Sequence, residues 1–136
     1  MKKVIFLILA TIASIQFSFA QENTFQLSSH ILDISTGKPA PNVTITLSKM
    51  DKNNHWVTVD EKKTDANGRV KDFLKQGKTS HVGVYKLTFH TQPYYKSLNQ
   101  KSFYPFIDVV FELADYEHYH VPITLSPFGY STYRGN

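Results

Sequence analysis

The sequence of 136 residues contains no cysteine, one tryptophan and only two arginines. Without cysteine the chain forms no disulfide bridge, so its stability depends on a packed core and on contacts between subunits. Its apolar run, Val4 to Ile15, is about 12 residues long, whereas a membrane-spanning helix needs roughly 20. These absences exclude a disulfide-stabilised scaffold and argue against a membrane anchor.

The first twenty residues have the composition of a secretory signal peptide. Lys2 and Lys3 form a basic start, Val4 to Ile15 an apolar segment, and Ser18 to Ala20 a small-x-small cleavage site. We therefore expect an exported, periplasmic protein that is cut after Ala20, with release outside the cell as the alternative. Residues 21–136 then form a single domain without a membrane partner.

The basic excess of the chain is partly due to this signal peptide. Fifteen Lys and Arg against eleven Asp and Glu give a formal net charge of +4, and removing Lys2 and Lys3 lowers it to +2. No basic block with interleaved aromatic residues is left in the domain. We therefore expect no nucleic-acid partner.

Short alternating segments separated by turns predict an all-β domain. Apolar and polar residues alternate along Phe25–Ile34, Val43–Ser48, Val84–Phe89 and Ile107–Leu113, which is the period of half-buried strands. Further strands are expected at 55–62, 69–74, 119–125 and from about 130. About seven or eight such strands predict a sandwich of two sheets.

Two local signals refine this prediction. Asp65–Gly68 is the strongest turn, because its Asn-Gly pair readily adopts the positive φ of a hairpin turn, and Arg69 follows that turn directly. A single short helix is expected from Pro93 to about Asn99, because proline suits the first helical position.

The C-terminal stretch concentrates residues that are suited to chemistry. The odd-numbered residues from Tyr119 to Leu125 are apolar or aromatic and should face a core, which leaves His120 on the opposite face. Pro122 has no N–H to donate, so this strand should be an edge, contain a bulge or be locally unpaired. A tail with a guanidinium, Arg134, follows. This arrangement is more typical of a site than of core packing.

The histidines of this stretch allow two interpretations. His118 and His120 project from one face and could share a zinc ion with His30 as a third ligand. However, the chain offers no cysteine and no carboxylate at ligand spacing to complete such a site. We therefore expect no metal.

Acid–base chemistry fits these residues better. Neutral histidine is the usual general base near pH 7, and a nearby guanidinium lowers the pKa of an imidazole because it disfavours the charged form. Arg69 and Arg134 are the two arginines, and a guanidinium matches paired oxygens as lysine does not. The alternative interpretation is that both arginines are surface charge.

Five segments resemble the motifs of the 5-hydroxyisourate hydrolases, the transthyretin-related proteins of purine catabolism. The opening motif corresponds to Leu27–Asp33 with Gly37–Ala40, and the middle motif to Thr64–Arg69. The C-terminal signature corresponds to His118–Pro122 and Tyr130–Gly135. The resemblance extends from Leu27 to the end of the chain, and the tail is its most specific part.

The resemblance implies a transthyretin-like sandwich of two four-stranded sheets with one short helix. It also implies a homotetramer, built as a dimer of dimers, with active sites at the dimer–dimer interface. The implied substrate is 5-hydroxyisourate, whose six-membered ring is opened by hydrolysis of an amide-type C–N bond. No cofactor is implied.

The resemblance also implies the residues of the site. His30, Arg69 and His120 are the expected catalytic set, with His30 and Arg69 also binding substrate, and either histidine could be the base. The expected substrate-binding tail consists of Tyr133, Arg134, Gly135 and Asn136. Asn136 departs from the family, whose tail usually ends in serine. The difference matters because an amide cannot relay a proton as a hydroxyl can.

Two other functions stay open at this point. A small-ligand carrier of the transthyretin type would bind without turnover, but such carriers lack the Tyr-Arg-Gly tail. An exported β-sandwich interaction module would not need aligned histidines.

Overall fold

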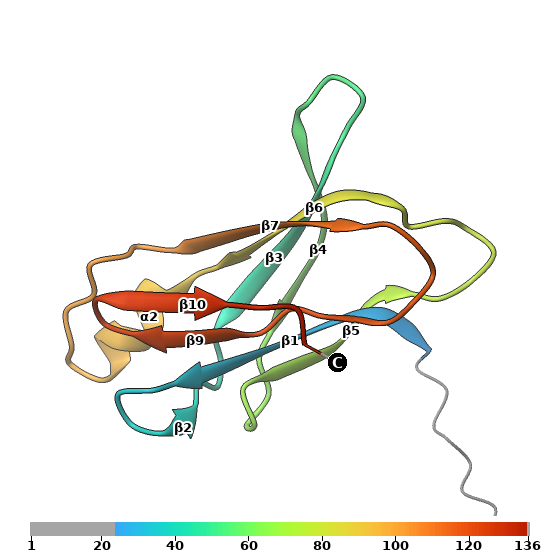
Figure 1. The fold of residues 1–136 in the computed structure, drawn as a ribbon. Helices are drawn as coiled ribbons and strands as arrows, with labels where there is room; N and C mark the ends of the chain where they lie inside the picture. Colours follow the sequence, from blue (N-terminus) through green and yellow to red (C-terminus); the bar gives the residue numbers. More distant parts are fainter. Residues whose placement is uncertain (1–23, 136) are drawn as a thin grey trace, which may run out of the picture.

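The computed structural model describes residues 24–135, and these form two β-sheets packed face to face, as Figure 1 shows. The predicted signal peptide and Asn136 lie outside the described residues. Within residues 24–135, no helix is both long enough and apolar enough to cross a membrane.

The first sheet has four antiparallel strands in the order β4-β3-β6-β7. The alternating sequences of β3, β6 and β7 place one face of each strand in the core, where Ile45, Leu47, Leu87 and Phe89 are fully buried. The bounds of these strands are β4 (Trp56–Lys63), β3 (Thr44–Met50), β6 (Gly83–Phe89) and β7 (Ile107–Leu113).

The second sheet is built around β1, which pairs on both edges (Figure 1). On one edge β1 pairs antiparallel with β5 and with the two-residue strand β2. On the other edge it pairs in parallel with β8 and β9, and β10 follows antiparallel to β9. The bounds are β1 (Phe25–Asp33), β2 (Lys38–Pro39), β5 (Arg69–Lys75), β8 (Tyr119–His120), β9 (Ile123–Ser126) and β10 (Gly129–Thr132).

The sandwich of two sheets is confirmed, although the second sheet contains six strands and not the four expected. The strand expected at 119–125 is divided into β8 and β9, because Pro122 has no N–H for the ladder. Among an edge strand, a bulge and a locally unpaired strand, the structure therefore shows local unpairing at Pro122. If β8 and β9 are counted as one strand and the short β2 is set aside, four main strands are left.

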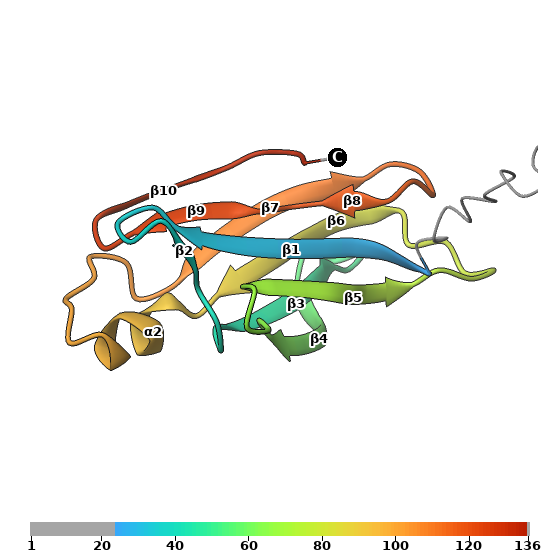
Figure 2. The ribbon, with the colours of Figure 1, turned by 90° about the horizontal axis from the view of Figure 1, so that it is seen from below.

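The predicted helix is present but begins earlier than expected. Helix α2 (Thr91–Ser97) has His90 at its N-cap, so Pro93 is its third residue and not its first. Proline is tolerated there because the first N–H groups of a helix have no partner within the helix. Asn99, expected inside the helix, lies beyond its end with a φ of 58°. Figure 2 shows α2 at one end of the sandwich.

The side-chain alternation predicted for the C-terminal stretch is confirmed. Tyr119, Val121, Ile123 and Leu125 are all buried in the core, whereas His120 is half-buried on the other face. The core therefore determines the direction in which His120 projects.

The Asn-Gly turn is also found, and it packs directly against β1. Gly68 has a φ of +69°, its N–H donates to the Asp65 carbonyl over 2.9 Å, and its carbonyl accepts from the Ile31 N–H over 2.9 Å. A Cβ atom added to Gly68 would lie 2.6 Å from the Ile31 carbonyl oxygen. This contact requires glycine and positions the start of β5 beside β1.

We predict that Gly68→Ala lowers the free energy of unfolding more than Gly37→Ala does. Gly37 has a similar φ of +67° but no atom within 4 Å of an added Cβ. The Gly37→Ala variant therefore measures the cost of the backbone strain without a steric clash. That strain alone should cost about 1 kcal/mol, and the clash at Gly68 should raise the loss to about 3 kcal/mol. Urea unfolding of both variants measures the difference; equal losses would contradict the prediction.

Candidate active site

The structure brings the three predicted catalytic residues together on the outer face of the second sheet. His30 lies on β1 and is the register partner of Arg69, the first residue of β5. On the other edge of β1, Ser28 is the register partner of His120 on β8. Since Ser28 and His30 are two residues apart, they project from the same face. Residues from three strands, far apart in sequence, therefore meet on one surface.

Burial and charge in this cluster favour the neutral form of both His30 and His120, the two histidines of the predicted catalytic set. Burial is the largest cause that lowers the pKa of His120, and the positive charge of Arg69 is the second, with smaller contributions from His30 and His118. Burial and then Arg69 also lower the pKa of His30, against a hydrogen bond with the Asn67 backbone and the charge of Asp65. Each imidazole therefore carries a lone pair at pH 7.

Ser28, which the sequence analysis did not select, links two of the histidines. Its Oγ lies 2.9 Å from Nε2 of His118 and 2.9 Å from Nδ1 of His120. His118 is held in turn by Nδ1, 2.9 Å from the Phe25 carbonyl oxygen. The only signal in the sequence was the position of Ser28 two residues before His30. The parallel pairing of β1 with β8, which places Ser28 beside His120, is visible only in the structure.

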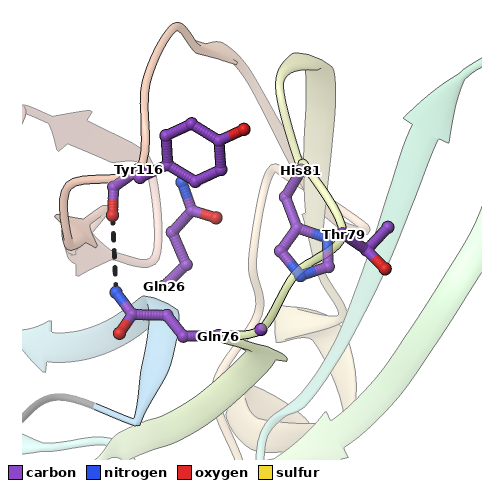
Figure 3. A pocket seen from close by; sticks show the side chains of 6 residues that line it. Gln26, Gln76, Thr79, His81 and Tyr116 are labelled. Atoms are coloured by element: carbon purple, nitrogen blue, oxygen red, sulfur yellow. Dashed lines mark hydrogen bonds between the residues drawn. The ribbon is translucent and has the colours of Figure 1, made fainter.

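Two glutamines bond to the loop that leads into His118, and Figure 3 draws one of these bonds, from Gln76 to Tyr116. Gln26 donates from Nε2 to the Asp115 carbonyl over 2.6 Å, and Gln76 donates from Nε2 to the Tyr116 carbonyl over 3.4 Å. Gln26, Gln76 and Tyr116 line a hollow of about 180 Å³, and none of the predicted site residues lines it. The two hydrogen bonds hold the loop against β1 and the end of β5, and so fix the position from which the chain enters His118.

The tail returns to the site through Gly135. The Gly135 N–H donates to the His120 carbonyl over 2.8 Å, and a Cβ atom at Gly135 would lie only 2.6 Å from Cδ2 of His120. The ring of His120 is therefore held between Ser28 at Nδ1 and the Gly135 backbone at its opposite edge. Any larger residue at 135 would have to displace the tail or the ring.

The structure does not bring Arg134 and Tyr133 to the histidines. The guanidinium carbon of Arg134 lies 4.6 Å from the centroid of the Tyr119 ring, and Tyr119 projects from β8 to the face opposite His120. Arg134 and Tyr133 instead line a groove of about 370 Å³ with residues 109–112 of β7. Asn136 lies outside the described residues.

The geometry gives no support to a shared zinc ion. Among residues 24–135, no group of three His, Cys, Asp or Glu side chains is arranged to hold a metal. His118 and His120 each direct one ring nitrogen to the hydroxyl of Ser28. The cluster is arranged as a hydrogen-bond network beside a guanidinium.

Fold and site together define a transthyretin-like β-sandwich with histidines and an arginine on the outer face of one sheet. The HIUase/Transthyretin family matches residues 27–135, and the chain belongs to this family. The predicted fold class and family are thereby confirmed.

Named relatives agree with this assignment. A Caenorhabditis elegans protein named "Probable 5-hydroxyisourate hydrolase" is 48% identical over 114 residues, which cover 83% of this chain and 83% of the relative. The solved structure of Klebsiella pneumoniae 5-hydroxyisourate hydrolase is 36% identical with a TM-score of 0.68, covering 81% of this chain and 98% of that one. Sparus aurata transthyretin is 28% identical with a TM-score of 0.75, covering 81% and 96%.

We predict that Arg69→Gln raises the pKa of His120 toward its ordinary value of 6.5, because a positive charge that disfavours the imidazolium is lost. The pKa should stay below 6.5, since burial is the larger cause and is unchanged. Arg69→Lys keeps the charge and is the matched control. An NMR titration of the ring proton on Cε1 measures both variants, and an equal rise in both would contradict the role of the charge.

Proposed function

We propose that the chain is a 5-hydroxyisourate hydrolase that opens the six-membered ring of this purine catabolite at an amide-type C–N bond. The relatives that carry this name support the proposal. The observation that carries it is the shared face of His30, Arg69 and His120, where two neutral imidazoles stand beside a guanidinium.

In the proposed reaction a neutral histidine activates water. His120 or His30 takes one proton from a water molecule while the oxygen of that water attacks the ring carbonyl carbon. When the C–N bond breaks, the same proton is returned to the departing ring nitrogen. The second water proton leaves the new carboxyl group for solvent, so the products are the carboxylate and the N–H of the ureidoimidazoline, and no cofactor is needed.

Arg69 would stabilise the charge that develops during this attack. The carbonyl oxygen becomes an oxyanion, and the planar fork of a guanidinium can hold it together with a neighbouring urea-like oxygen. A preorganised donor of this kind is typically worth about 10²–10³ in rate. The same charge lowers the pKa of His120, so Arg69 serves both the base and the oxyanion.

The tail is proposed to close the substrate pocket. The position of Gly135 against the His120 ring supports this role. For Arg134, contact with substrate requires its guanidinium to leave the ring of Tyr119, so the proposed role of Tyr133 and Arg134 includes a local movement of the tail. Asn136 would follow at the end of this segment.

We further propose a homotetramer, a dimer of dimers, with the sites at the dimer–dimer interface. In support of this, β7 and β10 are the last strands of their sheets, and edge strands pair readily with another chain. Val110 on β7 and Tyr130 on β10 are large exposed apolar or aromatic residues. Light scattering should give four times the protomer mass; a monomer or a simple dimer would contradict this assembly.

Export is part of the proposal on the evidence of the sequence. The basic start, the apolar segment and Ala20 before Gln21 motivate it. Protein recovered from the periplasm or the medium should begin at Gln21. A cytoplasmic protein that keeps Met1–Ala20 would contradict export.

The decisive experiment mixes purified protein with freshly generated 5-hydroxyisourate and follows the ultraviolet decay. The wild-type protein should accelerate the decay, and His120→Ala should lower kcat by about 10²–10⁴-fold, because the general base is lost. His55→Ala is the control, since the His55 side chain is 76% exposed and precedes β4, a strand of the other sheet.

Decay no faster than in buffer would reject the hydrolase. Full activity of His120→Ala would remove His120 from the catalytic set. The carrier alternative would be favoured if the wild-type protein bound a small aromatic ligand at equilibrium without consuming 5-hydroxyisourate.

A further inference from the structure

The hydrogen-bond network around Ser28 specifies which nitrogen of His120 carries the proton. The Phe25 carbonyl can only accept, so Nδ1 of His118 must donate to it. In neutral His118, Nε2 is then the acceptor, and the Ser28 hydroxyl must donate its hydrogen to it. The Ser28 oxygen is left to accept, and its remaining partner is Nδ1–H of His120.

The consequence is a defined tautomer at the proposed catalytic base. With its proton on Nδ1, neutral His120 has its lone pair on Nε2, the ring nitrogen farthest from the main chain. Gly135 packs on the Cδ2 edge, so the ring has little freedom to turn about the Cβ–Cγ bond and carry Nδ1 away from Ser28.

We infer that Ser28 and His118 are positioning residues that hold His120 in the Nδ1–H tautomer, so that Nε2 is available as the base. The inference rests on the proposed hydrolase function for its kinetic consequence, whereas the tautomer is a property of the folded chain alone. Ser28 acts on the His120 ring directly, and His118 acts on it through Ser28. Both are therefore positioning residues and not catalytic residues.

The register of β1 makes Ser28 suited to this role. Ser28 is the direct register partner of His120, so its short side chain reaches Nδ1 without an intervening water molecule. A serine hydroxyl both donates and accepts, which a relay between two imidazoles requires. Alanine at 28 would leave Nδ1 of His120 without this acceptor, and threonine would restore it.

The first test reads the tautomer directly. Nitrogen-15 NMR of histidine-labelled full-length protein at neutral pH should show His120 with Nδ1 protonated and Nε2 unprotonated. Ser28→Ala should mix the two tautomers, and Ser28→Thr should restore the wild-type pattern. Ser131→Ala is the matched control, because within residues 24–135 the Ser131 hydroxyl bonds to Thr124 on the neighbouring strand and to no histidine. An Nε2–H pattern in the wild-type protein, or an unchanged pattern in Ser28→Ala, would overturn the inference.

The second test is kinetic. Ser28→Ala should lower kcat on 5-hydroxyisourate by about 10²-fold with little change in KM, since misplacing a catalytic group by about 1 Å has an effect of that size. Ser28→Thr should recover most of the rate. A changed tautomer with an unchanged kcat would overturn the positioning role. If the wild-type protein shows no hydrolysis, the proposed function fails, and the NMR result still decides the tautomer.

The link to His118 is tested in the same way. His118→Gln keeps an acceptor for the Ser28 hydroxyl through its amide oxygen, whereas His118→Ala removes the acceptor. The glutamine variant should preserve the His120 tautomer and most of kcat, and the alanine variant should lose both. Equal behaviour of the two variants would remove His118 from the network.

Discussion

The two-sided pairing of β1 is the constraint on which the site depends. β5 places Arg69 opposite His30, and β8 places His120 opposite Ser28. A slip of one residue in either pairing would turn the slipped strand's side chains to the opposite face of the sheet. Val70 and Phe73 of β5 and Tyr119 of β8 are buried and resist such a slip, because it would bring them out of the core. Core packing therefore maintains the site, although none of His30, Arg69 and His120 belongs to the core.

In this cluster, burial and the charge of Arg69 both lower the pKa of His120. Half-burial disfavours the imidazolium of His120, and the guanidinium of Arg69 disfavours it further. Without Arg69, burial alone would still favour the neutral ring, but no fixed positive charge would face a developing oxyanion. Without burial, water would screen the guanidinium and weaken its effect on both histidines. A base and an electrostatic donor can share one small surface because the same positive charge favours both roles.

The sequence predicted the strands and their faces well, because alternation and turn chemistry are local. The odd-numbered residues around His120 were assigned correctly to the core, and the Asn-Gly turn before Arg69 was found. Non-local features were missed. The role of Ser28 depends on the pairing of strands about ninety positions apart, and the stacking of Arg134 on Tyr119 depends on the path of the tail. The helix start was misplaced because proline suits several positions of a first turn.

The open face of the sheet gives a physical argument for assembly. Arg69 is exposed in the single chain, and a charge in contact with bulk water stabilises an oxyanion only weakly. Catalysis by oriented donors is strong where water is excluded, because the local dielectric is then low. A second subunit placed over this face would exclude water from His30, Arg69 and His120 without any change in their register. The proposed tetramer would therefore supply what an outer sheet face lacks, namely a lid, while β1 continues to determine the geometry.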